Sequence, residues 1–261
     1  MTLIARPIPV GTQLRAWRQR RRRSQLDLAL DAGISQRHLS FVESGRARPS
    51  RDMVLHLAEQ LEVPLRERNA LLTAAGFAPR FADRPLDDPS LTAARGIVDT
   101  ILQAHAPNPA LAVDRHWHMI AANAAVAPLL RGVADLALLQ PPVNVIRLSL
   151  HPAGLAPAIA NLPAWRTHVL GRLRRQVQAS ADPTLAALLA EVTAFGDAAA
   201  TAPDDDIAMP LELDTPVGRL SFLSTITVFG TPTEVTLSEL AIEAFYPLDA
   251  ATAARLALLL A

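Results

Sequence analysis

Residues 24–46, SQLDLALDAGISQRHLSFVESGR, constrain the fold more than any other stretch of this 261-residue chain. Ser24 can accept hydrogen bonds from the free amides of a first helical turn, and Gly33 can end that helix in a left-handed conformation. Ser35 is placed to begin a second helix, and Gly45 is placed to end it. The stretch therefore predicts two short helices joined by a tight turn.

The second of these helices has an apolar side and a polar side. Leu39 and Val42 are spaced three apart and point inward. The opposite side carries Gln36, Arg37, Ser40 and Phe41. A Gln side chain can pair bidentately with adenine and an Arg side chain with guanine, so this surface suits the major groove of DNA. The alternative is a helix pair that only packs inside a helical domain.

The pattern SQxxLAxxAGxSxxxLSxxExG in this stretch resembles the helix-turn-helix of the XRE (Cro/C1-like) repressor family, over roughly residues 10–77. The resemblance implies an all-α domain of five helices, in which Arg18 would form an internal ion pair with Glu43. The DNA contacts that it implies are Ser24 and Gln25 to a phosphate, Ser35, Gln36 and Arg37 to base edges, Ser40 and Phe41 one turn further along, and Arg46 and Arg48 to phosphates.

The other helices of this part follow from apolar spacing and capping residues. They are expected over about 12–22, 50–61 and 64–76. The run Arg20–Arg23 at the end of the first helix is either a solvated helix terminus or a further phosphate contact. The family usually has a glycine and an apolar residue near positions 22 and 23, so two arginines there depart from its pattern.

Charge divides the chain into two parts. Residues 1–80 hold 14 Arg and 7 acidic residues, whereas residues 81–261 hold 11 Arg and 18 acidic residues. The basic part would attract DNA, and the acidic part would be repelled by it. The chain has no Lys and no Cys, which excludes a Ser-Lys dyad, a Schiff-base lysine, a P-loop lysine, a thiol nucleophile and a disulfide.

The expected domains are a DNA-binding domain over 1–80, a linker over 81–92, where prolines are frequent, and a second domain over 93–261. The chain shows no apolar signal core and no apolar run of the roughly 18 residues that a membrane helix needs. We therefore expect a soluble, cytoplasmic protein with no membrane partner. Helix-turn-helix regulators commonly bind DNA sites of two-fold symmetry, so we further expect a homodimer.

The second domain reads as α+β. ALAVDRHWHMIAAN (110–123) predicts a hairpin, and the stretch 207–247 holds three runs rich in β-branched residues separated by Gly and Pro turns. Helices are expected over 155–195 and 249–260, a turn at Asp204–Asp206, and a short helix capped by Asn123. This order predicts one antiparallel sheet with helices on one face.

NVIRLSLHPAGLAPAIANLPAWRTHVLGRLRRQ (144–175) resembles the ligand-binding domain of MmyB-like transcription regulators, which is related to PAS sensor domains. The similarity spans roughly 95–261, and the hairpin with Trp117 and the AAN at 121–123 fit it too. The resemblance implies a fatty acid or similar lipid-like ligand held between the sheet and the helices.

The residues themselves suggest four ligand-binding candidates. Arg147 lies in an apolar run and could meet a carboxylate with its bidentate guanidinium, or could form an internal salt bridge. His151 could donate to the ligand or bond to the backbone. Trp117 and Trp165 could line a pocket or belong to the core. His168, Arg172 and Arg175 form one helical stripe, which we expect to face solvent; the alternative is contact with a ligand headgroup or with a dimer partner.

His116 and His118 lie two apart in the predicted hairpin and could begin a metal site, but the sequence places no third ligand. No catalytic motif is present, so we expect no enzyme activity, no resident cofactor and no bound metal. The function predicted is a ligand-responsive, DNA-binding transcription regulator. The alternatives are a second domain that only dimerises and an HTH-fused metal-dependent enzyme.

Overall fold

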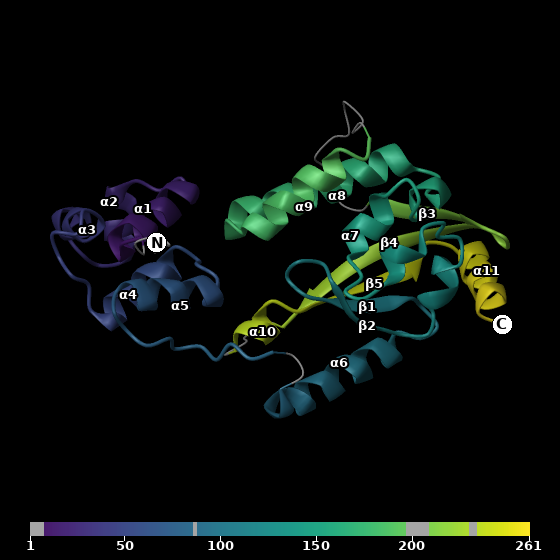
Figure 1. Ribbon diagram of the computed structural model, residues 1–261, viewed down its shortest axis with the longest axis horizontal. Coiled ribbons are helices and arrows are strands. Elements are labelled where there is room, and N and C mark those ends of the chain that lie inside the picture. Colours follow the sequence, from purple (N-terminus) through teal and green to yellow (C-terminus); the bar gives the residue numbers. More distant parts are fainter. Residues whose placement is uncertain (1–7, 86–87, 197–208, 230–233) are drawn as a thin grey trace, which may run out of the picture. The chain divides into compact units, whose positions relative to one another are not determined.

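The computed structural model of the protein describes residues 8–85, 88–196, 209–229 and 234–261. The chain divides into two compact units (Figure 1): the first holds the described residues up to Arg84 together with Glu234 and Val235, and the second holds the other described residues. The turn expected at Asp204–Asp206 lies outside the described residues. Across the described ranges, none of the helices has both the length and the apolar character required to cross a membrane.

The first unit is a group of five helices around one core. They are α1 (Val10–Arg20), α2 (Gln25–Asp31), α3 (Gln36–Glu43), α4 (Arg51–Gln60) and α5 (Leu65–Ala74). Ser24, Ser35 and Ser50 cap α2, α3 and α4, each accepting a hydrogen bond from the backbone amide three residues later. The five-helix prediction is therefore confirmed, together with the N-terminal caps that fix where α2 and α3 begin.

Buried leucines from all five helices fill the core of this unit. Leu14, Leu28, Leu39, Leu57 and Leu71 are fully buried. Only part of α2 reaches the core, because Leu28 is buried whereas Leu26 and Leu30 are 51% and 69% exposed. In a helix of only two turns, the spacing of the apolar residues does not by itself show which of them reach the core.

Two backbone positions in the first unit are sterically constrained. A Cβ added at Gly11 of α1 would lie 2.2 Å from the carbonyl oxygen of Val42, so α1 and α3 approach each other where only glycine fits. Arg22, which follows α1, has a φ of 53°. This is the left-handed conformation that a glycine adopts without strain, and it explains the glycine in the family pattern.

The second unit is built on a five-stranded antiparallel sheet with the strand order β2-β1-β5-β4-β3. The strands are β1 (Ala110–Val113), β2 (Met119–Ala122), β3 (Pro210–Thr215), β4 (Gly218–Val228) and β5 (Ala241–Pro247). The hairpin and the three later strands predicted from the sequence are confirmed. Strand β5 lies between β1 and β4, so the last strand joins the hairpin to the meander.

Helices cover both faces of this sheet. They are α6 (Thr92–Ala104), α7 (Val145–Leu150), α8 (Leu162–Ser180), α9 (Pro183–Thr193), α10 (Val235–Ser238) and α11 (Ala250–Leu260), with short 3-10 turns at Pro89–Leu91, Ala127–Leu130, Leu136–Leu139 and Ala156–Ala158. Helices α7, α8 and α9 share one large core with the sheet. Helix α6 packs on the opposite face, where Val98 and Leu102 contact Ile242 (Figure 1).

The structure corrects two expectations for this unit. The prediction that helices cover one face only is wrong. Side chains alternate between the two faces of a strand, and the residues of β1 and β5 that point away from the large core are also apolar. These residues pack against α6. Asn123 caps no helix either. Its buried amide accepts from the backbone N–H of Ala110 and donates to the carbonyl oxygens of Leu102 and Asn108, which ties α6 to the hairpin.

Candidate DNA-binding face and ligand cavity

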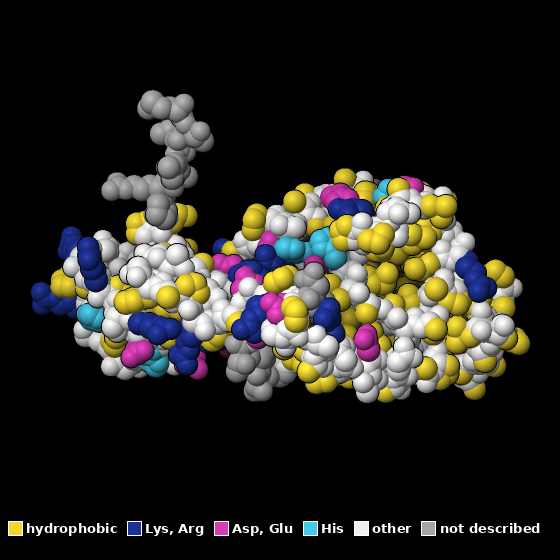
Figure 2. Space-filling model, turned by 60° about the horizontal axis from the view of Figure 1, so that its bottom comes forward, with side chains coloured by type: hydrophobic (Ala, Val, Ile, Leu, Met, Phe, Trp, Pro, Cys, Tyr) yellow, Lys and Arg dark blue, Asp and Glu magenta, His cyan; other side chains and the backbone are white. Residues whose placement is uncertain are grey.

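The predicted DNA-contacting residues gather around the start of α3 and the loop after it. Ser24, Ser35, Gln36, Arg37, Arg46 and Arg48 are exposed, and Gln25, Ser40 and Phe41 are half-buried. Arginine side chains are conspicuous on the surface of this unit in Figure 2. The guanidinium carbons of Arg37 and Arg46 lie 5.3 and 5.9 Å from the ring centre of Phe41. The ring thus holds two cations beside the exposed helix start, as cation–π attraction favours.

A buried ion pair supports this face from behind. Arg18 donates to both carboxylate oxygens of Glu43, at 2.6 and 2.9 Å, and Gln25 donates to Glu43 at 2.8 Å. The hydrogen bond from Glu43 raises the pKa of Arg18, outweighing the opposing effect of burial. The predicted internal pair is therefore present. The amide of Gln25, expected at a phosphate, is partly occupied by this pair.

Two arginines of the run at the end of α1, Arg21 and Arg23, stabilise the fold. Arg21 donates to the carbonyl oxygens of Leu61 and Glu62, and Arg23 donates to that of Gln60 and pairs with Asp31. These carbonyls lie at the end of α4, where they have no partner within the helix. Arg21 and Arg23 fill neither of the two roles left open for this run, because they bind the backbone at the end of α4 instead.

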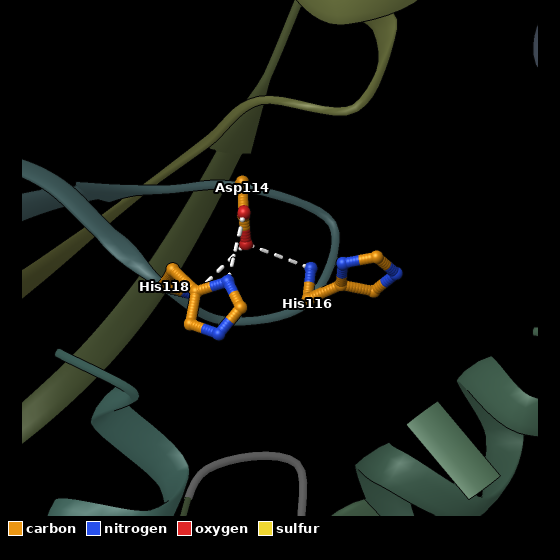
Figure 3. A group of neighbouring side chains, drawn as sticks. All are labelled: Asp114, His116 and His118. Carbon is orange, nitrogen blue, oxygen red and sulfur yellow. Dashed lines mark hydrogen bonds and ion pairs between the residues drawn. The ribbon is translucent and has the colours of Figure 1, made fainter. Parts of the chain in front are cut away.

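A cluster of Asp114, His116 and His118 closes the hairpin between β1 and β2 (Figure 3). One Asp114 carboxylate oxygen accepts from the backbone amides of His116 and His118, and the other lies 3.1 Å from Nδ1 of His118. Nε2 of His116 lies 2.9 Å from the carboxylate of Asp182. Asp114 is thus the third metal-type ligand that the sequence did not place, although its hydrogen bonds also account for it as a turn residue.

Asp182 connects this hairpin to the start of α9. Burial raises the pKa of its carboxyl, but the hydrogen bonds from His116 and from the backbone of Thr184 outweigh burial, so the pKa is lowered overall. Asp182 also caps α9 and lies 3.5 Å from Arg115. The charged groups around the hairpin therefore hold it against α9, a structural task that needs no bound ion.

A cavity of about 770 Å³, counting its open mouth, lies between the sheet and helices α7 and α8. Its apolar walls come from the sheet, α7, α8 and the 3-10 turn Ala127–Leu130: Leu111, Met119, Leu129, Val145, Leu148, Trp165, Val169, Leu213, Phe222 and Phe245. Small-molecule pockets are concave and mostly apolar, and the walls of this cavity share that character. Hydrophobic side chains also gather on the surface of this unit in Figure 2.

One ion pair stands in the wall of the cavity. Arg172 of α8 donates to Glu243 of β5 at 3.0 Å, and both residues line the cavity. The side chains of Arg172 and Glu243 are only 15% and 5% exposed. The guanidinium of Arg172 also lies 4.3 Å from the ring centre of Trp117, whose indole N–H donates to Gln176. Nε of Arg172 is buried without a hydrogen-bond partner.

Of the four ligand-binding residues predicted from the sequence, Trp165 lines this cavity and its indole N–H donates to Ser149, another lining residue. Arg147, Trp117 and His151 do not belong to the lining. Arg147 is paired bidentately with Glu191, at 2.5 and 2.7 Å, which is the internal salt bridge weighed as its alternative. His151 accepts from the backbone N–H of Ala153.

Sequence reasoning missed the two charged residues of the cavity. The expectation that the stripe of His168, Arg172 and Arg175 faces solvent is wrong for Arg172, whose side chain is 15% exposed. Glu243 is a lone acid within the apolar strand AIEAF, which is the same signal that singled out Arg147 in NVIRLSL. A lone charge in an apolar segment signals a buried partner but does not name it.

Comparison with known protein families identifies both units. Residues 14–68 match a helix-turn-helix family, and residues 94–259 match the MmyB-like transcription regulator ligand binding domain. The second match covers more than half of the chain. The chain belongs to the MmyB-like transcription regulators. In this family member, the exposed start of α3 is part of a DNA-binding helix-turn-helix, and the cavity lies within the ligand-binding domain. No curated protein matched the chain.

Proposed function

We propose that this transcription regulator binds a small lipid-like effector, a fatty acid or a related compound, in the cavity of its second unit. The observation that carries the proposal is the cavity itself, whose walls are apolar side chains from the sheet, α7 and α8. Burial of an alkyl chain against such walls is favourable by about 0.8 kcal/mol per methylene. A domain that only dimerises would need no such space in its core.

The effector then alters DNA binding by favouring one of two states of the protein. A ligand shifts an equilibrium only through its different affinity for the two states, so dimer geometry or the orientation of α3 must differ between them. We further propose a homodimer that presents two α3 helices about one helical turn of DNA apart. Ser35, Gln36 and Arg37 would read bases, and Arg46 and Arg48 would hold phosphates.

The test begins with native mass spectrometry of gently purified protein, followed by denaturing extraction of any bound compound. A dimer that carries an additional mass matching an acyl compound supports the proposal and names the effector class. Binding to a selected DNA duplex is then measured by fluorescence anisotropy with and without saturating effector. An unchanged affinity at saturation refutes the regulatory coupling.

A matched pair of variants links the response to the cavity. Leu129→Trp fills space at a lining position that is half-buried, whereas Leu258→Trp adds the same bulk at a residue 67% exposed and outside the lining. We expect Leu129→Trp to lose effector binding and the DNA response, and Leu258→Trp to keep both. Equal behaviour of the two variants would place the effector elsewhere.

A metal-dependent enzyme is the second candidate, and the observation that favours it is the third ligand-type group that Asp114 adds to His116 and His118. We propose instead that the cluster acts structurally and that the protein is not an enzyme. Metal analysis of protein purified without chelators separates the two. One equivalent of zinc per chain, lost in a His118→Ala variant, would support the metal-dependent enzyme.

A further inference from the structure

The polar groups of the cavity are few and balanced in charge. Among the described residues of its lining, Arg172 and Glu243 are the charged side chains, and they form one ion pair with each other. Their formal charges sum to zero. The cavity therefore offers a ligand a polar point in an apolar wall, but no net charge to compensate an ion.

The guanidinium of Arg172 still has N–H groups to donate. One terminal nitrogen donates to Glu243 and the ring of Trp117 lies against the guanidinium, while Nε is buried and has no hydrogen-bond partner. Arg172 lines the cavity, so an acceptor atom on a molecule inside it would bond to a guanidinium N–H that Glu243 does not occupy. Arg172 therefore identifies where the polar end of a ligand would lie.

The nature of that acceptor follows from the charge balance. A carboxylate beside Arg172 would also lie near the carboxylate of Glu243, leaving one negative charge in excess in a buried, apolar site. Removing an unpaired charge from water is far more costly than removing a neutral carbonyl that accepts one hydrogen bond. A neutral carbonyl accepts a hydrogen bond from the guanidinium and leaves its pair with Glu243 intact.

Nearby cations do not compensate the negative charge that a bound carboxylate would add. Burial, followed by the fields of Arg172 and Arg175, lowers the pKa of His168, so its neutral form is favoured. Arg175 is exposed, and water and salt screen its charge. Nothing else charged stands among the described lining residues, so the balance at the polar end is set by Arg172 and Glu243.

We propose that the effector is a neutral acyl compound, such as an alkyl ester, amide or lactone, whose carbonyl oxygen accepts a hydrogen bond from the guanidinium of Arg172. Glu243 has two tasks in this site: it holds the guanidinium in place, and it discriminates against free carboxylates. The inference rests on the proposed function, because it takes the cavity as the effector site, and among the acyl compounds proposed there it favours neutral derivatives over the free fatty acid.

The experiment compares two ligands with the same alkyl chain, methyl decanoate and decanoate, on the full-length protein at pH 7.5 by isothermal titration calorimetry. We expect the ester to bind at least roughly tenfold more tightly than the acid. Equal or tighter binding of decanoate overturns the neutral-effector inference while supporting an acyl-binding cavity. If neither compound binds, the proposed acyl-effector function fails, and this inference fails with it.

Variants then test the role of Glu243. Glu243→Gln leaves Arg172 with an uncompensated positive charge, so we expect the preference to shift toward decanoate by at least roughly tenfold. Glu191→Gln is the matched control, because it makes the same change in an Arg–Glu pair outside the cavity lining. A ratio unchanged in Glu243→Gln, with circular dichroism showing a folded protein, overturns the inference, as does an equal shift in the control.

Discussion

Removing the carboxylate of Glu43 should strongly destabilise the DNA-binding unit. Its oxygens accept hydrogen bonds at 2.6 and 2.9 Å from Arg18 and at 2.8 Å from Gln25, and the side chains of Arg18 and Glu43 are 10% and 3% exposed. Breaking a buried pair from one side leaves the other charge without compensation, which costs about 3–5 kcal/mol. A unit of roughly 80 residues has about 4–12 kcal/mol of stability, so Glu43→Ala removes much of it.

Native-state hydrogen exchange in the full chain measures this loss directly. Each 1.4 kcal/mol corresponds to about a tenfold change in an equilibrium constant, so the slowest amides of α1 and α3 should exchange roughly 100–4,000 times faster in Glu43→Ala. Asp83→Ala is the control, because it breaks the solvent-exposed pair with Arg66 and should cost about 0–1 kcal/mol.

The double variant Arg18→Met, Glu43→Leu separates the loss of the pair from the presence of an unpaired charge. Replacing both partners with apolar residues of similar size removes the uncompensated charge, so most of the stability should return. An acceleration below tenfold in Glu43→Ala would refute the reasoning. So would a double variant that exchanges as fast as the single one.

Four further outcomes are expected. Arg37→Ala should cost about 1–3 kcal/mol on the operator and relax preference at one base pair in a binding-site selection; equal weakening on all duplexes would make it a phosphate contact. Arg22→Gly should raise the stability of the first unit by about 1 kcal/mol in calorimetry, because a φ of 53° strains any residue with a Cβ; no gain would contradict this. Gly11→Ala should destabilise the same unit by at least about 1–3 kcal/mol, since its Cβ would overlap the carbonyl oxygen of Val42, and an unchanged midpoint would show that α1 can shift. Burial and then two neighbouring arginines lower the pKa of His168, so the folded second unit resists its protonation. Stability should be fully present above the unfolded pKa of about 6.5 and fall as the pH drops through the lower folded value, and His168→Gln should flatten that fall in thermal melts at pH 7.5 and 5.5.

The first unit was predictable because its signals are local. Ser24 and Ser35 are each followed within three residues by the amide that they cap, and the turn between the two helices needs only Gly33. The departure at Arg22 was also visible in the sequence. Its consequence, a left-handed arginine whose neighbours bind the end of α4, required the structure, since those carbonyls lie about 40 residues along the chain.

The second unit was predictable in its elements but less so in its site, because the site depends on long-range pairing. The periodicity of β5 identifies a strand, yet the sequence does not say that β5 lies between β1 and β4. That position places Glu243 opposite α8 and within reach of Arg172, a residue 71 positions away in the chain. Arg147 and Glu243 both carried the signal of a lone charge among apolar residues, whereas Arg172 was expected to face solvent, and only the fold shows which of these charges line the cavity. Arg147 has both ends of its fork satisfied by Glu191, whereas Arg172 keeps a buried donor in a cavity wall. The unsatisfied donor, rather than the presence of a charge, is therefore the feature that distinguishes a ligand-binding arginine from a structural one here.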